Sequence, residues 1–522
     1  MPNQKQLRLK FASTSPARWF AWSVALMATS LLVWCLYFLG PFGIIALIGA
    51  IAGLLALLRV PWLGVLILVA SVPAQEFGAL QAGGQSLTLT RAAFPLAVAG
   101  YVIAILIKRE PLAGSRLIAP YIGFVGVVVA SLGWAGSMTA AGAEIGRWLT
   151  ALVSFLILSH FLLRAPQSRV ILFVAIMALG GVFEATFGVT QSFLALGPAS
   201  FRVGDAGSRA FGTFGQPNSY AGYLEMILFP VAWMAIFLVG RLIHTYQRYC
   251  DARMNGVFRS RPERITLTVD GLVALVFCVS TVVILSGIVA SYSRGAWLGV
   301  AAGGLTTTLL YHRHARMAVL LLAPAGLLML LGGMTSVVPQ SVSERITTGF
   351  ADVRPFDASR VRITDDNFAA AERMAHWQVG WRMFTDQPLT GVGAGNFNEQ
   401  YPNYYVREQF SDSRGHAHNY YIHLLSETGL AGLASYLVLI GSIAALALTV
   451  LLKAPHGFER MLTLGGFGTI VSTGIHNVFE NLHVLNLSIQ IGLVWVLVIV
   501  GHQRWRAKQE SNRTEPATEK YS

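Results

Sequence analysis

Two kinds of side chain in this sequence could act on a negatively charged substrate. Arg209 and Arg294 each stand beside an apolar segment, and His418 lies in the string Gly-His-Ala-His-Asn at 415–419. A guanidinium group binds a phosphate through two parallel hydrogen bonds, and an imidazole exchanges a proton near neutral pH. Together these residues could hold a phosphate-like anion and exchange a proton with a bound group.

The elements that must position these residues are membrane helices. The chain has 522 residues, of which 54% are hydrophobic and 12% are charged, whereas soluble proteins carry about 25% charged residues. This composition excludes a single soluble domain, a disordered chain and a soluble nucleic-acid-binding protein. The three cysteines are scattered and predict neither a disulfide framework nor a cysteine metal site. We predict an all-α, polytopic integral membrane helical bundle.

Fourteen apolar runs are candidates for membrane spans of about 20 residues. They lie near 19–39, 41–58, 60–74, 91–107, 117–137, 144–163, 170–195, 219–240, 266–290, 296–311, 317–337, 429–452, 461–480 and 484–501. Only a few residues around Arg59 and Pro61 separate the second run from the third, so these two could form a hairpin that does not cross fully. The prediction is therefore 12 to 14 transmembrane helices, and the first is expected to be an uncleaved helix.

The lysines and arginines predict the orientation of the bundle, because they collect on the cytoplasmic side of membrane proteins. With the N-terminus inside, cytoplasmic segments hold most of the 38 basic residues, and the net charge of +13 follows mainly from this asymmetry. Both termini are then cytoplasmic. Eight of the other basic residues lie in one long outer segment, 338–417.

The segment 338–417 is the longest non-apolar stretch, and loops of this length are usually functional or disordered. Within it, 371–386 has large apolar residues at helical spacing. These residues are Met374, Trp377, Trp381 and Phe384. We expect an ordered subdomain that lies on the membrane.

Four strings in chain order resemble the bacterial O-antigen ligase and O-antigen polymerase superfamily. They are RAFGTFGQPNSYAGYL from Arg209, SYSRGAWLG from Ser291, WRMFTDQPLTGVGAGNF from Trp381 and HNYYIHLLSETGLAGL from His418. In the ligases the last string reads His-(Asn/Ser)-x9-Gly, with Thr three residues later. Here His418 and Gly429 fit this spacing, and Gly432 stands in place of the threonine.

The resemblance implies a glycosyltransferase that moves a glycan from undecaprenyl diphosphate to an acceptor hydroxyl. The reaction would occur on the periplasmic face of the bacterial inner membrane, by direct inverting displacement, without cofactor or metal ion. The implied domains are a cytoplasmic segment at 1–18, transmembrane helices at 19–337, a periplasmic loop subdomain at 338–417, the last helices at 418–501 and a cytoplasmic tail at 502–522. The partners would be the donor lipid, a lipid A–core or glycan acceptor and the bilayer, and no nucleic acid.

Within this framework each candidate residue has an expected role. His418 is the expected general base or acceptor-positioning residue, and Arg294 and Arg209 are the expected diphosphate clamp. The candidate substrate-binding residues are Arg373, Arg202, Asn419, Trp377 and Tyr404. A structural role is also open for each, such as helix capping at His418 and Asn419 or snorkelling of the arginines. Gly391–Gly395 is expected to form a tight turn under the histidine.

Several functional alternatives remain at this level. The acceptor could be lipid A–core, as in an O-antigen ligase, another lipid-linked repeat, as in an O-antigen or exopolysaccharide polymerase, or a protein. A lipid or glycan transporter is the alternative of a different class. Transporters usually show paired half-repeats with ionisable residues near the midplane, and the two halves of this sequence show no convincing repeat.

Overall fold

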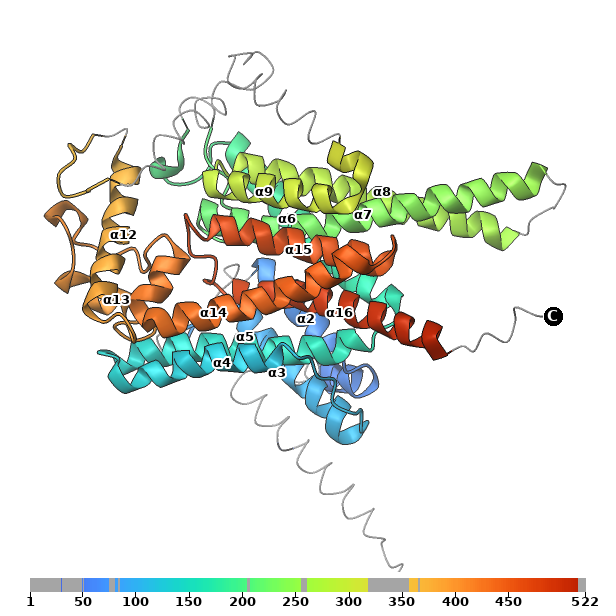
Figure 1. The fold of residues 1–522 in the computed structure, drawn as a ribbon, viewed down its shortest axis with the longest axis horizontal. Coiled ribbons are helices and arrows are strands. Elements are labelled where there is room, and N and C mark those ends of the chain that lie inside the picture. Colours follow the sequence, from blue (N-terminus) through green and yellow to red (C-terminus); the bar gives the residue numbers. More distant parts are fainter. Residues whose placement is uncertain are drawn as a thin grey trace, which may run out of the picture.

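A computed structural model describes residues 51–514, apart from 75–79, 83–84, 204–206, 255–260, 318–355 and 365–366, together with Ser30 and Gly49. The predicted spans at 19–39 and 317–337 lie outside the described residues, except for Ser30 and Met317. The same is true of the first part of the predicted loop subdomain. The described chain is a helical bundle with a smaller helical unit at one end (Figure 1).

The longer helices follow the predicted apolar runs closely. They are α2 (Leu63–Ser71), α3 (Leu89–Val102), α4 (Ile118–Ala130), α5 (Met138–Leu163), α6 (Gln167–Phe193), α7 (Pro217–Met254), α8 (Arg261–Ala290), α9 (Arg294–Tyr311), α12 (Phe368–Asp386), α13 (Phe397–Gln400), α14 (Tyr420–Lys453), α15 (Phe458–His476) and α16 (Leu487–Thr514). A π-helical turn, η2 (Ile103–Ile107), extends α3. Two short strands, β1 (Leu80–Ala82) and β2 (Gln85–Leu87), form an antiparallel hairpin in which Leu80 pairs with Leu87.

Seven of the described helices are long and apolar enough to cross a membrane, which confirms the prediction of a polytopic membrane protein with an all-α bundle. The pair Ile51–Arg59 and Leu63–Ala74 is bent by 119° and would make an eighth span if it counts as one. This bend agrees with the expectation that the chain around Arg59 and Pro61 forms a hairpin.

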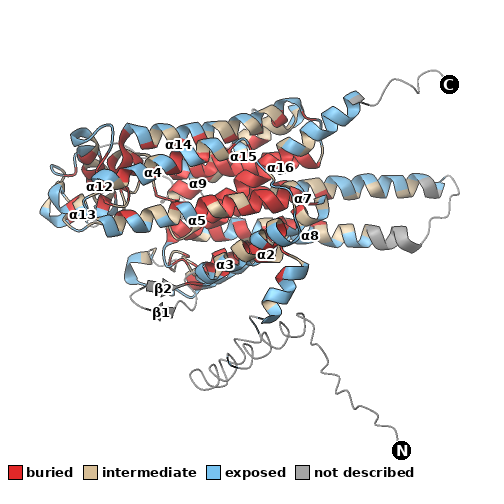
Figure 2. Ribbon diagram, turned by 90° about the horizontal axis from the view of Figure 1, so that it is seen from below, coloured by how far each residue is buried: buried red, intermediate tan, exposed pale blue. Residues whose placement is uncertain are grey.

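The core of the bundle lies around α15 and α16. The most apolar window of α16 is 83% buried, and α15 packs against α7, α9, α14 and α16. Figure 2 shows buried residues concentrated in these central helices. Glycines allow the close approach, since a Cβ on Gly465 would lie 2.8 Å from the Pro230 backbone of α7. Small residues at helix contacts are typical of membrane bundles.

The helices α12 and α13 form a unit that covers one end of the bundle and packs on α14 (Figure 1). The helical stretch predicted at 371–386 lies within α12, but its large apolar residues are not all buried, since Trp381 is 52% exposed. The buried stripe of α12 instead repeats every fourth residue, at Ala371, Ala375, Val379 and Met383. The helix also approaches α14 closely at Gly380, where a Cβ would lie 2.7 Å from the Ile422 side chain.

Candidate functional site

A buried carboxylate lies at the centre of the polar cluster where this unit meets the bundle. Glu480, in the connection between α15 and α16, is 5% exposed. Its Oε1 accepts hydrogen bonds from Nδ1 of His418 at 3.2 Å and from the backbone N–H of Asn481 at 3.1 Å, and it lies 3.4 Å from Nε2 of His416. Its Oε2 accepts a hydrogen bond from the side chain of Asn218 at the start of α7. The carboxylate thus joins three segments that are distant in the sequence.

The surroundings of Glu480 keep it ionised. Burial alone would raise the pKa of this carboxyl, but nearby His418 and His416, the hydrogen bond from His418 and the positive charge of Arg373 outweigh it. The pKa of Glu480 is therefore well below its usual range. Arg373, on α12, is close enough to contribute to this effect. The site consequently holds a fixed negative charge beside an imidazole.

His418 is held in a backbone conformation that a residue with a side chain rarely adopts. Its φ is +50°, in the left-handed region that favours glycine. The indole N–H of Trp377 donates to the carbonyl of His418 at 3.2 Å, and the Tyr420 N–H donates to the carbonyl of Asn477 at 2.8 Å. Asn419 begins α14 as a helix cap. These contacts fix where the imidazole points.

The hydrogen bond to Glu480 decides which nitrogen of His418 carries the proton. A carboxylate can only accept, so Nδ1 of His418 is protonated and Nε2 keeps its lone pair. Nε2 has no hydrogen-bond partner in the part of the chain that the structure describes. A carboxylate that orients an imidazole in this way leaves the second nitrogen available as a base and stabilises the imidazolium that forms.

His416 supports His418 rather than replacing it. Its Nδ1 accepts the backbone N–H of His418 at 3.1 Å, so Nε2 carries the proton and faces Oε1 of Glu480 at 3.4 Å. Burial lowers the pKa of His416 to about 3; the charge of Glu480 opposes the shift and His418 adds to it. A neutral imidazole whose two nitrogens are both engaged is poorly placed to take a proton from a substrate.

Arg209 is connected to this cluster through Asn218. One guanidinium nitrogen of Arg209 donates to Oδ1 of Asn218 at 3.0 Å, and Nε donates to the carbonyl of Ser291 at 3.0 Å. Because Asn218 also donates to Glu480, an unbroken chain of contacts runs from Arg209 to His418. The structure therefore brings these two predicted site residues together.

Arg294 begins α9 beside the same connection. A Cβ on the next residue, Gly295, would lie 2.6 Å from the His476 ring and 3.2 Å from Cβ of Phe479, which places the start of α9 against the segment that carries Glu480. Arg294 is half-buried there. The start of α9 thus brings a second predicted arginine to the end of the bundle where His418 lies.

A buried His–Glu pair lies next to the start of α9. Nδ1 of His476 is 3.0 Å from Oε1 of Glu225, and Ser472 donates to the other carboxylate oxygen at 2.9 Å. On its other side, Nε2 of His476 is 3.4 Å from Oγ of Ser293. The pair links α7, α9 and α15 and so stabilises the position of Arg294.

Comparison with known proteins agrees with this geometry. Residues 279–437 match the family model described as O-antigen ligase. This region of the chain is similar to the O-antigen ligase family. The match includes the start of α9, all of α12 and the first half of α14. No curated protein sequence matches the chain.

Within the matched region, α12 supports the loop that carries the histidines. Nδ1 of His376 donates to the carbonyl of Glu372 at 2.8 Å, so Nε2 accepts the backbone N–H of Arg414, at 3.1 Å. Burial lowers the pKa of His376 to about 4, which keeps Nε2 unprotonated. Arg414 also pairs with Glu372, at 2.9 Å. These bonds fasten the loop to α12.

The remaining predicted substrate-binding residues lie in different places. Trp377 contacts His418, as described above. The carboxamide oxygen of Asn419 accepts two backbone N–H groups of α14, at 3.0 and 3.1 Å, and therefore acts as a helix cap. The Tyr404 phenol bonds to Asp386, nine residues beyond Trp377 and so about 13 Å further along α12. Arg202 is exposed, and its backbone pairs with Ser208. Tyr404 and Arg202 are not brought to Glu480, and a substrate contact for them stays a prediction.

The glycine-rich turn at 391–395 lies against α14, where Glu427 anchors it. Its expected place under His418 stays a prediction. The two oxygens of Glu427 accept the N–H groups of Gly395 at 2.8 Å and Phe397 at 3.0 Å. At Gly429 the helix is interrupted, with φ of 63° and ψ of −160°. A Cβ on Gly429 would lie 2.4 Å from the carbonyl oxygen of Leu389, so only glycine fits this crossing.

Three side chains of the site could also form part of a metal site. One ligand atom each from His416, His418 and Glu480 lies within 4.8 Å of the others. Two imidazoles and a carboxylate can hold a catalytic zinc with one open position. Against this, the positive charge of Arg373 acts on the same carboxylate, and a second cation there would be repelled.

Sequence reasoning missed Glu480 and Asn218 as site residues. Glu480 stands at the end of the apolar run 461–480, where a single charge looks like the boundary of a span. The available signal was the cluster of polar residues at the end of this run and just beyond it. Asn477, Glu480, Asn481 and His483 are all buried, and buried polar groups at a span end need partners.

Proposed function

We propose that this protein is a glycosyltransferase that moves a glycan from undecaprenyl diphosphate to an acceptor hydroxyl on the periplasmic face of the inner membrane. The observation that supports this most directly is the His418–Glu480 pair, with Nε2 of His418 uncommitted and Arg209 joined to the same carboxylate through Asn218. A base and a guanidinium group therefore occur together where a lipid-linked diphosphate would lie.

The proposed step is a single displacement in which His418 acts as the base. The acceptor hydroxyl gives its proton to Nε2 of His418 while its oxygen forms a bond to the anomeric carbon of the donor sugar. The bond from that carbon to the diphosphate oxygen breaks, and the diphosphate leaves with the electron pair. Glu480 stabilises the imidazolium, as the carboxylate of a catalytic triad does. Attack opposite the leaving group inverts the anomeric configuration.

We propose that Arg209, Arg294 and Arg373 stabilise the leaving diphosphate without a metal ion. Guanidinium groups bind phosphate oxygens in pairs and keep their charge at every physiological pH. Arg373 is close enough to influence Glu480, Arg209 is two hydrogen bonds from it, and Arg294 begins a helix packed beside it. These arginines supply positive charge from three different elements.

We favour lipid A–core as the acceptor, which would make the protein an O-antigen ligase. Gly432, which replaces the threonine of the ligase motif, is compatible with this. Its Cβ position is already filled, since it would fall 1.7 Å from Oγ1 of Thr428. A threonine one turn earlier on α14 thus occupies the space. The alternative is a polymerase, and expression in a strain that lacks its ligase separates the two: only a ligase restores capped lipopolysaccharide.

The direct test is transfer in vitro by purified protein, with a defined undecaprenyl-diphosphate glycan and either lipid A–core or a second lipid-linked glycan as acceptor. His418→Ala should abolish transfer while the protein is still made and inserted. His314→Ala, in an exposed histidine just beyond the far end of α9, is the matched control and should keep full activity. Full activity of His418→Ala would refute the base assignment, and no product with any acceptor would refute the glycosyltransferase proposal.

A further inference from the structure

A second concentration of basic side chains lies far from Glu480, at the opposite end of the bundle. A cavity of about 260 Å³ is bounded by the bend before α2, the segment after η2, the end of α5 and the start of α6. Four basic residues line it, namely Arg59, Lys108, Arg164 and Arg169, together with one carboxylate, Glu110. With a neutral His160, the lining has a net charge of +3.

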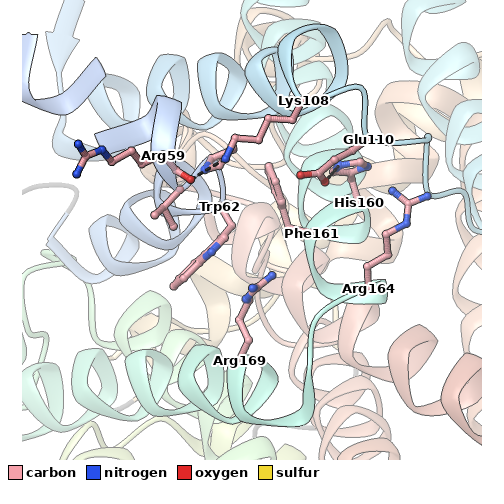
Figure 3. A pocket seen from close by; sticks show the side chains of 10 residues that line it. Arg59, Trp62, Lys108, Glu110, His160, Phe161, Arg164 and Arg169 are labelled. Carbon is pink, nitrogen blue, oxygen red and sulfur yellow. Dashed lines mark hydrogen bonds and ion pairs between the residues drawn. The ribbon is translucent and has the colours of Figure 1, made fainter. Parts of the chain in front are cut away.

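None of these four cations is neutralised by a neighbour. Among the described residues, no carboxylate lies within ion-pair distance of any of them, and Glu110 instead faces Nε2 of His160, at 3.2 Å. Figure 3 shows Arg164 and Arg169 projecting from either side of the connection between α5 and α6, with Lys108 and Glu110 across the cavity from them. The cavity thus gathers positive charge that its single carboxylate, Glu110, balances only in part.

Uncharged partners nevertheless hold these side chains in place. Nζ of Lys108 donates to the carbonyl of Arg59 at 2.6 Å, and Arg164 donates to the carbonyl of Pro111. The guanidinium of Arg169 lies over the Trp62 ring, 4.9 Å from its centroid. Such contacts orient a cation without cancelling its charge. The positions are therefore set before any anion arrives.

His160 adds a buried ring nitrogen, Nδ1, to the cavity. The residue is 1% exposed and lines the cavity. Its Nδ1 has no hydrogen-bond partner in the described structure, although buried polar atoms in proteins are nearly always hydrogen-bonded. Because Nε2 faces the carboxylate of Glu110 and carries the proton, Nδ1 is an acceptor, and it suits a ligand whose oxygen atoms include a hydroxyl group.

The position of the cavity indicates which molecule supplies those oxygens. α5 begins next to the site unit, where the Ser137 N–H donates to Asn396, and its 26 residues extend about 39 Å. Its end therefore lies at the opposite membrane surface. Exposed apolar residues surround this end: Leu58, Leu106, Ile107 and Leu112 are 37%, 70%, 63% and 69% exposed. They offer a surface for acyl chains directly beside the cations.

We propose that this cavity binds the phosphate of an anionic phospholipid from the leaflet opposite the candidate active site. Basic pockets between membrane helices suit such headgroups, and guanidinium pairs suit their phosphate oxygens. The cavity is slightly smaller than typical ligand pockets of about 300–1,000 Å³, so it takes the headgroup while the acyl chains lie on the apolar surface outside. The site does not depend on the glycosyltransferase reaction.

Native mass spectrometry of the detergent-purified full-length protein tests this proposal. The probes are phosphatidylglycerol, phosphatidylcholine and inorganic phosphate. We expect phosphatidylglycerol to bind at least about tenfold more tightly than phosphatidylcholine. The double variant Arg164→Gln, Arg169→Gln should lose at least roughly that factor, because charge-assisted hydrogen bonds disappear. The matched control Arg248→Gln, Arg313→Gln removes two exposed charges outside the cavity and should bind like the wild type.

Each outcome decides the proposal. Equal lipid binding by the cavity variant and the control variant would overturn it. So would binding of inorganic phosphate together with no preference between the two lipids, which would identify free phosphate as the ligand. If the double variant does not elute as a folded protein in size-exclusion chromatography, Arg169→Gln alone replaces it. In that variant only the contact with Trp62 is lost, and weakened phosphatidylglycerol binding is still expected.

Discussion

Replacing Glu480 by glutamine should slow glycan transfer strongly while leaving the shape of the site intact. Glutamine fills almost the same volume but has no negative charge to balance a protonated His418. The imidazolium and the carboxylate would face each other across the 3.2 Å contact between Nδ1 and Oε1. At an effective dielectric constant of about 20, that attraction is about 5 kcal/mol. Replacing a charged by a neutral hydrogen-bond acceptor alone loses about 2 kcal/mol.

These two values bracket the expected effect on the rate. Since about 1.4 kcal/mol corresponds to a factor of ten, kcat for transfer should fall roughly 30- to 5,000-fold. The assay is the initial rate of transfer from a defined undecaprenyl-diphosphate glycan, with kcat and KM determined separately. KM should change less than kcat, because the lost interaction develops only as the proton moves.

The matched control is Glu399→Gln, which removes one exposed carboxylate from the same unit. It should keep the wild-type rate, and size-exclusion profiles of both variants should match the wild type. A Glu480→Gln enzyme with kcat within threefold of the wild type would show that Glu480 does not stabilise a protonated His418. The proposed base mechanism would then have to be abandoned.

Three further predictions concern the clamp, the metal question and the support of the histidine loop. Arg294→Lys should reduce kcat/KM at least tenfold, because an ammonium cannot form two parallel hydrogen bonds to phosphate; equal activity would remove Arg294 from the clamp. Transfer should be unchanged by EDTA, and loss of activity that zinc restores would instead indicate that His416, His418 and Glu480 bind a metal ion. His376 has a pKa of about 4 in the folded chain and about 6.5 when unfolded, so the unfolded state takes up the proton as pH falls and stability decreases below pH 6.5. Between pH 7.5 and 5.0 this effect should lower the free energy of unfolding by about 2 kcal/mol. Thermal unfolding of His376→Gln should therefore depend less on pH than that of the wild type, and equal dependence would contradict this.

The membrane helices could be predicted from sequence because hydropathy is a local property. Apolar runs such as 170–195 reappear as helices with nearly the same bounds, here Gln167–Phe193. It was harder to predict which face of α12 is buried, because that face includes small residues such as Ala371 and Ala375. These two alanines are buried against Ala358 and Phe410, which lie outside α12 and leave no pattern within it.

The candidate site was predicted only in part, for a similar reason. His418 and Arg209 could be chosen from residue type and motif, and the structure places them in one network. Glu480, which connects them, is 62 residues from His418 and 262 residues from Asn218. Contacts over such separations follow from the packing of α7, α14 and α15 and leave no local signal. Arg202 illustrates the reverse case, since its position near Arg209 in the sequence does not bring its side chain to the site.

The length of α7 has a practical consequence for finding out which side of the membrane the site faces. The helix begins at the site with Pro217 and continues for 38 residues, or about 57 Å, whereas the hydrocarbon layer is about 30 Å thick. Its far half, with the adjoining part of α8, therefore projects well beyond the bilayer (Figure 1). A protease site or reporter inserted at the far end of α7 would be accessible from one compartment only. It would reveal the sidedness of the protein without disturbing the end of the bundle that carries His418.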